Sequence, residues 1–157
     1  MYILIMMNKL PSNYGVRQTI DNMEMNMPGL QVTYDGFQHC TSLKKPQDKT
    51  VAMDCPYTGK GEEFSPANMV GSGLAGCMLI SMGTLAIRDE IDINGTYVDV
   101  DVQQSEKRIE SISLVFNMVH AYSERERQKL ERAAGLCPIK SSFHSDTSID
   151  IKYKYPD

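Results

Sequence analysis

The sequence predicts an α+β fold, with short strands in both halves of the chain, one long helix without charges and a second, amphipathic helix. Apolar and polar residues alternate over several short segments, which is the pattern of a half-buried strand. Residues 66–87 carry no charged side chain, whereas residues 124–134 have a charged outer face. Strands and helices follow one another in blocks, and this order is typical of α+β domains.

The length of the chain sets the expected domain organisation. Its 157 residues suit one domain, and a hydrophobic content of 41% is enough for a packed core. We expect residues 1–29 to form an N-terminal arm, with a short helix at 17–25, and residues 30–157 to form a single domain. The apolar start of the chain lacks a basic region and a cleavage site, so it does not resemble a signal peptide.

The first block predicts strands joined by tight turns. Residues 30–43 alternate as a hairpin does, with Asp35-Gly36 as the turn signal. Residues 50–53 predict a further strand, and 56–63 a glycine-rich loop.

The long helix has clear start signals. Ser65 is a suitable N-cap, and Pro66 fits the first helical position. The pattern up to Arg88 shows little amphipathicity, which predicts a helix buried nearly all round rather than a membrane span. Small residues would allow another backbone to approach closely, at Gly71, Gly73, Ala75 and Gly76.

The second block predicts two strands, two helices and a closing strand. The strands are expected at 96–103 and 109–119, the latter with Ile112, Leu114, Phe116 and Met118 on one face. Ser123 and Glu126 form a capping box before a helix that runs to Ala134, with Gly135 as its stop signal. A short helix at 138–143 and a strand at 148–155 complete the fold.

Charge and cysteine content exclude several classes of function. The net charge of −4 argues against a nucleic-acid partner. The chain's four cysteines contain no C-x-x-C, and His39, His120 and His144 lack metal-ligand spacing, so we expect no metal and no cofactor. Four cysteines are too few for a disulfide scaffold, which favours reduced thiols and a cytoplasmic location.

Two cysteines stand in distinctive surroundings. Cys77 lies in the glycine-rich apolar helix, and Cys137 precedes a proline at a helix junction. If the fold brings them together, one thiolate can attack a peroxide and the other can close a disulfide. Each could instead be an ordinary packed residue, because free cysteine is often buried as a small hydrophobe. Cys40 and Cys55 have no motif around them and are interpreted as bystanders.

At these residues the chain resembles the OsmC/Ohr family, the osmotically inducible and organic hydroperoxide resistance proteins. The resemblance covers roughly residues 30–155, and its motifs are Gly59-Lys60-Gly61-Glu62-Glu63-Phe64-Ser65-Pro66, Gly76-Cys77-Met78, Met82-Gly83, the helix 127–134, Cys137-Pro138-Ile139 and Ser142. It implies β-sheets wrapped around a long buried central helix in an intertwined homodimer. It also implies reduction of organic hydroperoxides, with Cys77 as the peroxidatic and Cys137 as the resolving cysteine, and a dithiol reductant, possibly of the lipoyl type.

The chain departs from the family at the residues that activate the thiolate. Ala67 and Asn68 stand where relatives carry acidic residues, and the supporting arginine has no clear counterpart. Lys60, Glu62 and Glu63 are the candidates to replace that pair. These departures keep open an alternative from another class, a non-catalytic OsmC-like dimer that binds a ligand or senses the redox state.

Overall fold

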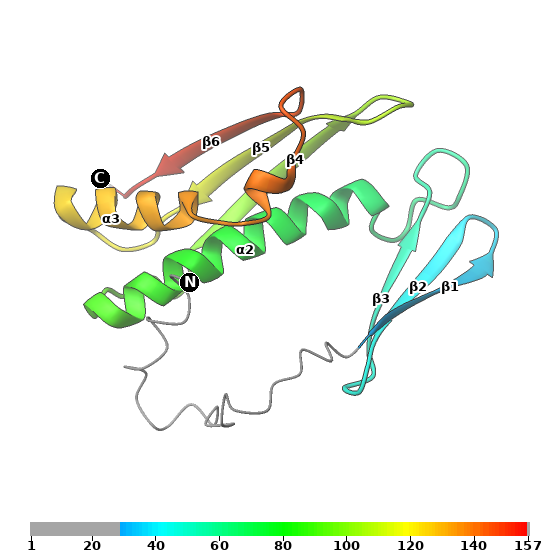
Figure 1. Cartoon of the computed structure of the whole chain (residues 1–157), viewed down its shortest axis with the longest axis horizontal. Helices are drawn as coiled ribbons and strands as arrows, with labels where there is room; N and C mark the ends of the chain where they lie inside the picture. The colour runs from blue at the N-terminus through cyan, green and yellow to red at the C-terminus, as the bar shows by residue number, and fades with distance from the viewer. Residues whose placement is uncertain (1–28, 157) are drawn as a thin grey trace. The chain divides into compact units, whose positions relative to one another are not determined.

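The computed structural model describes residues 29–156, in two compact units that comprise residues 29–69 and 70–156 (Figure 1). The expected N-terminal arm and its short helix at 17–25 lie outside the described residues. The single domain expected for residues 30–157 stays a prediction.

The first unit is built on a three-stranded antiparallel sheet, ordered β1-β2-β3, whose strands are β1 (Leu30–Gly36), β2 (His39–Lys44) and β3 (Lys49–Asp54). The hairpin and the third strand agree with the sequence prediction. The turn lies later than expected, because Phe37 and Gln38 take the positive φ values of 51° and 64° that a tight hairpin turn requires. Asp35 stabilises this turn by accepting the Thr41 hydroxyl at 2.7 Å and pairing with His39 at 3.1 Å.

Helix α2 (Pro66–Asp89) begins in the first unit and lies mostly in the second. Among the described residues it is the one helix long and apolar enough to cross a membrane, a test that the core helix of a globular protein also passes. One side of it is buried, at Gly71, Leu74, Ala75, Met78, Met82 and Ala86.

The expectation that α2 is buried nearly all round is wrong for the single chain. Ile80 is 72% exposed and Ile87 is 51% exposed, while Met78 and Met82 are fully buried. Close approach by a neighbour occurs at Gly71, where an added Cβ would lie 2.6 Å from Cγ2 of Val102. Gly73 and Gly76 have no such neighbour among the described residues. The exposed side is apolar all the same, which is why the sequence shows no amphipathic stripe.

The second unit packs α2 against a mixed three-stranded sheet. Its strands are β4 (Tyr97–Gln104), β5 (Ile109–Asn117) and β6 (Ser148–Lys154), with β5 antiparallel to β4 and parallel to β6. The alternation in β5 buries Ile112, Leu114 and Phe116 completely. These side chains and the buried side of α2 form one hydrophobic core.

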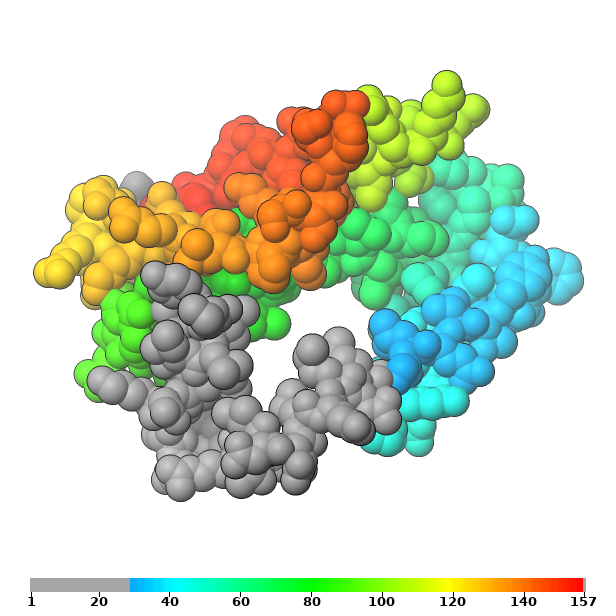
Figure 2. All heavy atoms as spheres, viewed as in Figure 1, coloured from blue at the N-terminus to red at the C-terminus, as the bar shows by residue number. Residues whose placement is uncertain are grey.

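Helix α3 (Glu124–Gly135) and the short 3-10 helix η3 (Lys140–Ser142) complete this unit. The predicted capping box is present, since Ser123 accepts the Glu126 N–H and Glu126 accepts the Ser123 N–H at 2.8 Å. Figure 2 shows the atoms of α3 and of the segment after it running beside those of β6. Arg127 of α3 lies 4.3 Å from the ring centre of Tyr155, just beyond β6.

Candidate functional site

The structure joins Cys77 and Cys137 as a disulfide, although they are separated by 60 residues in sequence. Cys77 lies about three turns into α2, and Cys137 lies two residues beyond the end of α3. Their Cα atoms are 5.9 Å apart, within the range that disulfides span. The arrangement can therefore alternate between a dithiol and a disulfide without moving either helix far.

The end of α3 determines where Cys137 lies. Its N–H donates to the Ala134 carbonyl at 3.3 Å, which continues the helical turn by one residue. After it, the hydroxyls of Ser141 and Ser142 donate to the Pro138 carbonyl at 2.8 and 3.1 Å. Cys137 is only 3% exposed and belongs to the hydrophobic core, so its thiol faces apolar surroundings.

Cys77 is less deeply placed than its partner. It is partly buried and packs against the same core, at the border between the buried side of α2 and its exposed side. A reagent that reaches the pair thus has better access to Cys77 than to Cys137. This difference matches a division of roles in which the outer sulfur meets a substrate and the inner one reacts only within the protein.

The start of α2 gives Asn68 a structural role. The Ser65 side chain accepts the Asn68 N–H at 3.1 Å, and the Asn68 side-chain oxygen accepts the Ser65 N–H at 3.2 Å and its hydroxyl. This is a reciprocal capping box with asparagine in the position usually held by glutamate or glutamine. Asn68, which stands where the family resemblance implies an acidic residue, thus helps to cap the helix.

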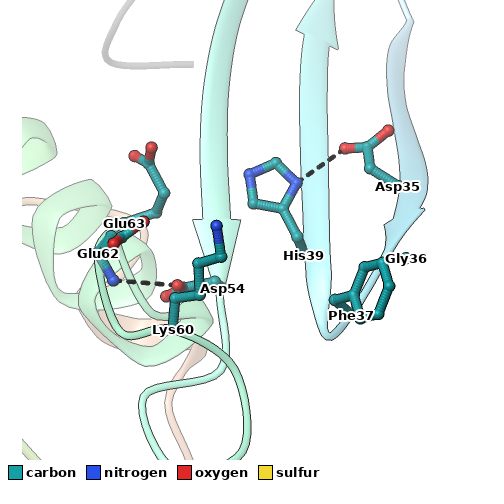
Figure 3. A pocket seen from close by; sticks show the side chains of 8 residues that line it. All are labelled: Asp35, Gly36, Phe37, His39, Asp54, Lys60, Glu62 and Glu63. Atoms are coloured by element: carbon teal, nitrogen blue, oxygen red, sulfur yellow. Dashed lines mark hydrogen bonds and ion pairs between the residues drawn. The ribbon is translucent and has the colours of Figure 1, made fainter.

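Lys60, Glu62 and Glu63, the candidates to support the thiolate, line a pocket of about 290 Å³ in the first unit. Figure 3 shows the rest of the wall, which comes from strands β1, β2 and β3 and from Phe37 in the hairpin turn. The three residues line the same pocket. Their support of the Cys77 thiolate stays a prediction. The pocket also contains two residues that the sequence did not single out as site residues, Asp35 and Asp54.

Cys55, interpreted from the sequence as a bystander, has a polarised thiol. The Thr58 hydroxyl donates to its Sγ at 3.1 Å, and this bond, with help from the backbone N–H groups of Tyr57 and Thr58, lowers the Cys55 pKa to about 7. The turn closes through the Gly59 N–H, which donates to the Cys55 carbonyl at 2.8 Å. The signal that could have found it is a threonine three residues after a cysteine that precedes a proline.

The remaining candidates have ordinary roles in the structure. Cys40 is a free, partly buried thiol in β2. His120 bonds to the Asn94 carbonyl at 3.0 Å, and His144 lies 3.5 Å from Asp146. No group of three or more histidine, cysteine or acidic side chains that could hold a metal ion occurs in residues 29–156.

A protein-family model described as "OsmC-like protein" matches residues 59–152, more than half of the chain. The chain therefore belongs to the OsmC-like family, as its resemblance at the two cysteine motifs indicated. A comparison with curated proteins finds no significant match.

Solved structures share the fold. The structure of an osmotic stress induced and detoxification response protein from Psychrobacter arcticus, a description given there as provisional, aligns with a TM-score of 0.76 and 26% identity, over 80% of this chain and 94% of that one. The organic hydroperoxide resistance protein OhrB of Bacillus subtilis aligns with a TM-score of 0.59 and 18% identity, over 80% and 98%. An OsmC-like protein of unknown function from Vibrio cholerae aligns at 14% identity with a TM-score of 0.61, over 78% and 97%. The α+β, OsmC/Ohr-like fold predicted from the sequence is confirmed.

Proposed function

We propose that the protein is a thiol-dependent peroxidase that reduces organic hydroperoxides. The observation that carries the proposal is the pairing of Cys77 with Cys137 across two helices. A dithiol that closes into an intramolecular disulfide can supply the two electrons that peroxide reduction requires. Family membership and the named function of the hydroperoxide resistance proteins among the structural relatives support the same activity.

The reaction proceeds in three balanced steps. The Cys77 thiolate attacks the terminal oxygen of the hydroperoxide, the O–O bond breaks, and with one proton the products are a Cys77 sulfenic acid and an alcohol. The Cys137 thiol attacks the sulfenic sulfur, forms the disulfide and releases water. An external dithiol, for which a lipoyl group is the proposed source, then reduces the disulfide by exchange and leaves as its own cyclic disulfide.

The surroundings of the two sulfurs favour an apolar substrate. Both cysteines contact the hydrophobic core, so the organic part of an alkyl hydroperoxide can be sheltered from water there. Hydrogen peroxide has no apolar part and gains no such binding energy.

We also propose a homodimer, because Gly73, Ile80 and Ile87 share the exposed apolar side of α2. Sedimentation equilibrium of the full chain tests it. A cytoplasmic location belongs to the same proposal, since a reducing compartment supplies dithiols.

A second candidate is a non-catalytic member of the family that binds a ligand or senses the redox state. The observation in its favour is that both cysteines contact the hydrophobic core, since apolar surroundings disfavour the thiolate that attacks a peroxide. In that case the disulfide would form slowly, and its formation would alter an interaction with a partner instead of completing a catalytic cycle.

Peroxide consumption by single variants separates the two candidates. With excess dithiol, the parent should consume cumene hydroperoxide faster than hydrogen peroxide, and Cys77→Ser should abolish this activity. Without dithiol, Cys137→Ser should consume one equivalent and stop at the Cys77 sulfenic acid, with no disulfide formed. Cys40→Ser is the matched control and should behave as the parent does. If Cys77→Ser consumes cumene hydroperoxide as fast as the parent, the peroxidase proposal fails.

A further inference from the structure

The pocket of the first unit carries an inference that is independent of the cysteine pair. Its wall contains four carboxyl groups, those of Asp35, Asp54, Glu62 and Glu63, against the single ammonium of Lys60 and the imidazole of His39 (Figure 3). All of these residues lie within residues 29–69. The pocket is therefore acidic whether or not the imidazole is protonated.

Asp54 has an unsatisfied atom in this wall. The residue is only 4% exposed, at the end of β3, and its Oδ2 accepts the Glu62 N–H at 3.0 Å. Its other oxygen, Oδ1, is buried and has no hydrogen-bond partner in residues 29–156. A buried carboxylate oxygen without a donor is costly, because burial removes its water and nothing replaces it. Asp54 therefore lacks one hydrogen-bond donor among the described residues.

The other acidic groups of the pocket differ in whether their carboxylates already have partners. Asp35 already pairs with His39 and accepts the Thr41 hydroxyl. Glu62 and Glu63 form no ion pair with any described residue. Free acceptors therefore lie at Asp54 and at the two glutamates, on the side of the pocket formed by the loop after β3.

We propose that this pocket binds a small organic cation with N–H donors, for which an alkylguanidinium is the best match. A planar guanidinium presents several donors at once, so it can satisfy Asp54 and a glutamate together. A bare metal ion fits poorly, since the described residues contain no group of side chains arranged to hold one. The volume of about 290 Å³ lies at the lower limit for small-molecule sites, which selects a ligand of few atoms.

Phe37 forms part of the rim. It is 93% exposed, and its left-handed backbone at φ 51° holds the ring at the hairpin turn beside the pocket. Aromatic faces attract guanidinium and ammonium groups. The rim therefore adds an attraction for the same class of ligand as the wall.

The test is an amide-detected NMR titration of the full chain with methylguanidinium chloride at constant ionic strength. The Glu62 amide, which donates to Asp54, is the reporter. Methylguanidinium should produce saturable shifts there, whereas tetramethylammonium, with the same charge and no N–H donor, should not. Equal responses to the two cations would mean general charge screening and would overturn the proposal.

Two variants and a control sharpen the test. Asp54→Asn keeps an acceptor for the Glu62 N–H but removes the charge, and it should weaken methylguanidinium binding by about tenfold or more. Glu106→Gln, at an exposed residue of the second unit that does not line the pocket, should bind as the parent does. Binding by Asp54→Asn as tight as that of the parent would contradict the proposal.

Lys60→Gln gives a prediction that does not depend on the folding of Asp54→Asn. Lys60 is exposed, and its ammonium competes with a cationic ligand, so its removal should tighten binding. If Lys60→Gln instead unfolds at lower denaturant and binds no better, the free oxygen of Asp54 is satisfied by Lys60, and the ligand proposal is wrong.

Discussion

Reduction of the Cys77–Cys137 disulfide should lower the free energy of unfolding by about 4 kcal/mol. The bond closes a loop between residues 60 positions apart, and the closed loop restricts the unfolded chain more than the folded one. In the chain-entropy description a loop of this length removes about 14 cal/mol/K from the unfolded state, which is ~4 kcal/mol at 25 °C. For a protein of this size the same change lowers Tm by roughly 10 °C.

The assay is urea unfolding followed by circular dichroism, with one sample oxidised and the other held in a phosphine reductant. The midpoint should fall on reduction. The denaturant dependence should rise, because the reduced chain exposes more surface when it unfolds. The phosphine avoids a thiol that could form mixed disulfides.

Two variants determine whether the effect belongs to this bond. A double variant, Cys40→Ser with Cys55→Ser, should keep the full difference between oxidised and reduced samples, because neither residue takes part in the bond. Cys137→Ala should show no difference at all. Equal midpoints for oxidised and reduced parent protein would refute the reasoning, since the two cysteines would then not be constrained in the folded chain.

Three further predictions follow from local contacts. Gly71→Ala should destabilise the protein by roughly 1–2 kcal/mol, since overpacking against Val102 and Val100 outweighs the gain in helix propensity, and in the Val102→Ala background the same substitution should cost less in urea unfolding. With the disulfide intact, Cys55 should react with iodoacetamide with an apparent pKa near 7, and Thr58→Val should move that pKa toward 9. Peptide mapping of the labelled protein across pH measures both values. An unchanged pKa in the variant would contradict the assigned cause. Arg88 and Lys129 hold the Asp89 pKa at about 2, below its ordinary value of 3.8. The contribution of Asp89 to stability is therefore complete above about pH 4 and is lost as pH falls through 2. Over that range the parent should lose more stability than Lys129→Met, and equal losses would show that the contact has no effect.

Local signals in the sequence predicted local structure well. The capping box at Ser123 and the alternation in β5 depend on residues close together in the chain, and both are present. The turn of the first hairpin was placed too early, because Phe37 and Gln38 do not favour the left-handed backbone they adopt. Contacts of Asp35 across the hairpin stabilise it, and these depend on the register of the two strands.

The candidate site was less accessible to prediction from the residues alone. Nothing local brings Cys77 and Cys137 together; the sequence offered this only as a possibility, and the family resemblance implied it. The burial of Asp54 arises when the loop after β3 returns, so that the Asp54 N–H donates to the Phe64 carbonyl at 3.1 Å. The polarised thiol of Cys55 depends on a turn that brings the Thr58 hydroxyl against sulfur. Both are results of tertiary or turn geometry that composition and periodicity do not carry.

The most direct test of the central proposal is a single-turnover experiment. Fully reduced protein receives one equivalent of cumene hydroperoxide, is quenched rapidly, and is examined by intact mass and peptide mapping. The proposal predicts a rapid loss of the mass of two hydrogen atoms, with Cys77 linked to Cys137 and with Cys40 and Cys55 still reduced. Unchanged thiols, or slow oxidation that falls first on the polarised Cys55, would contradict it and would mean that the chain keeps the family's fold without its peroxidase chemistry.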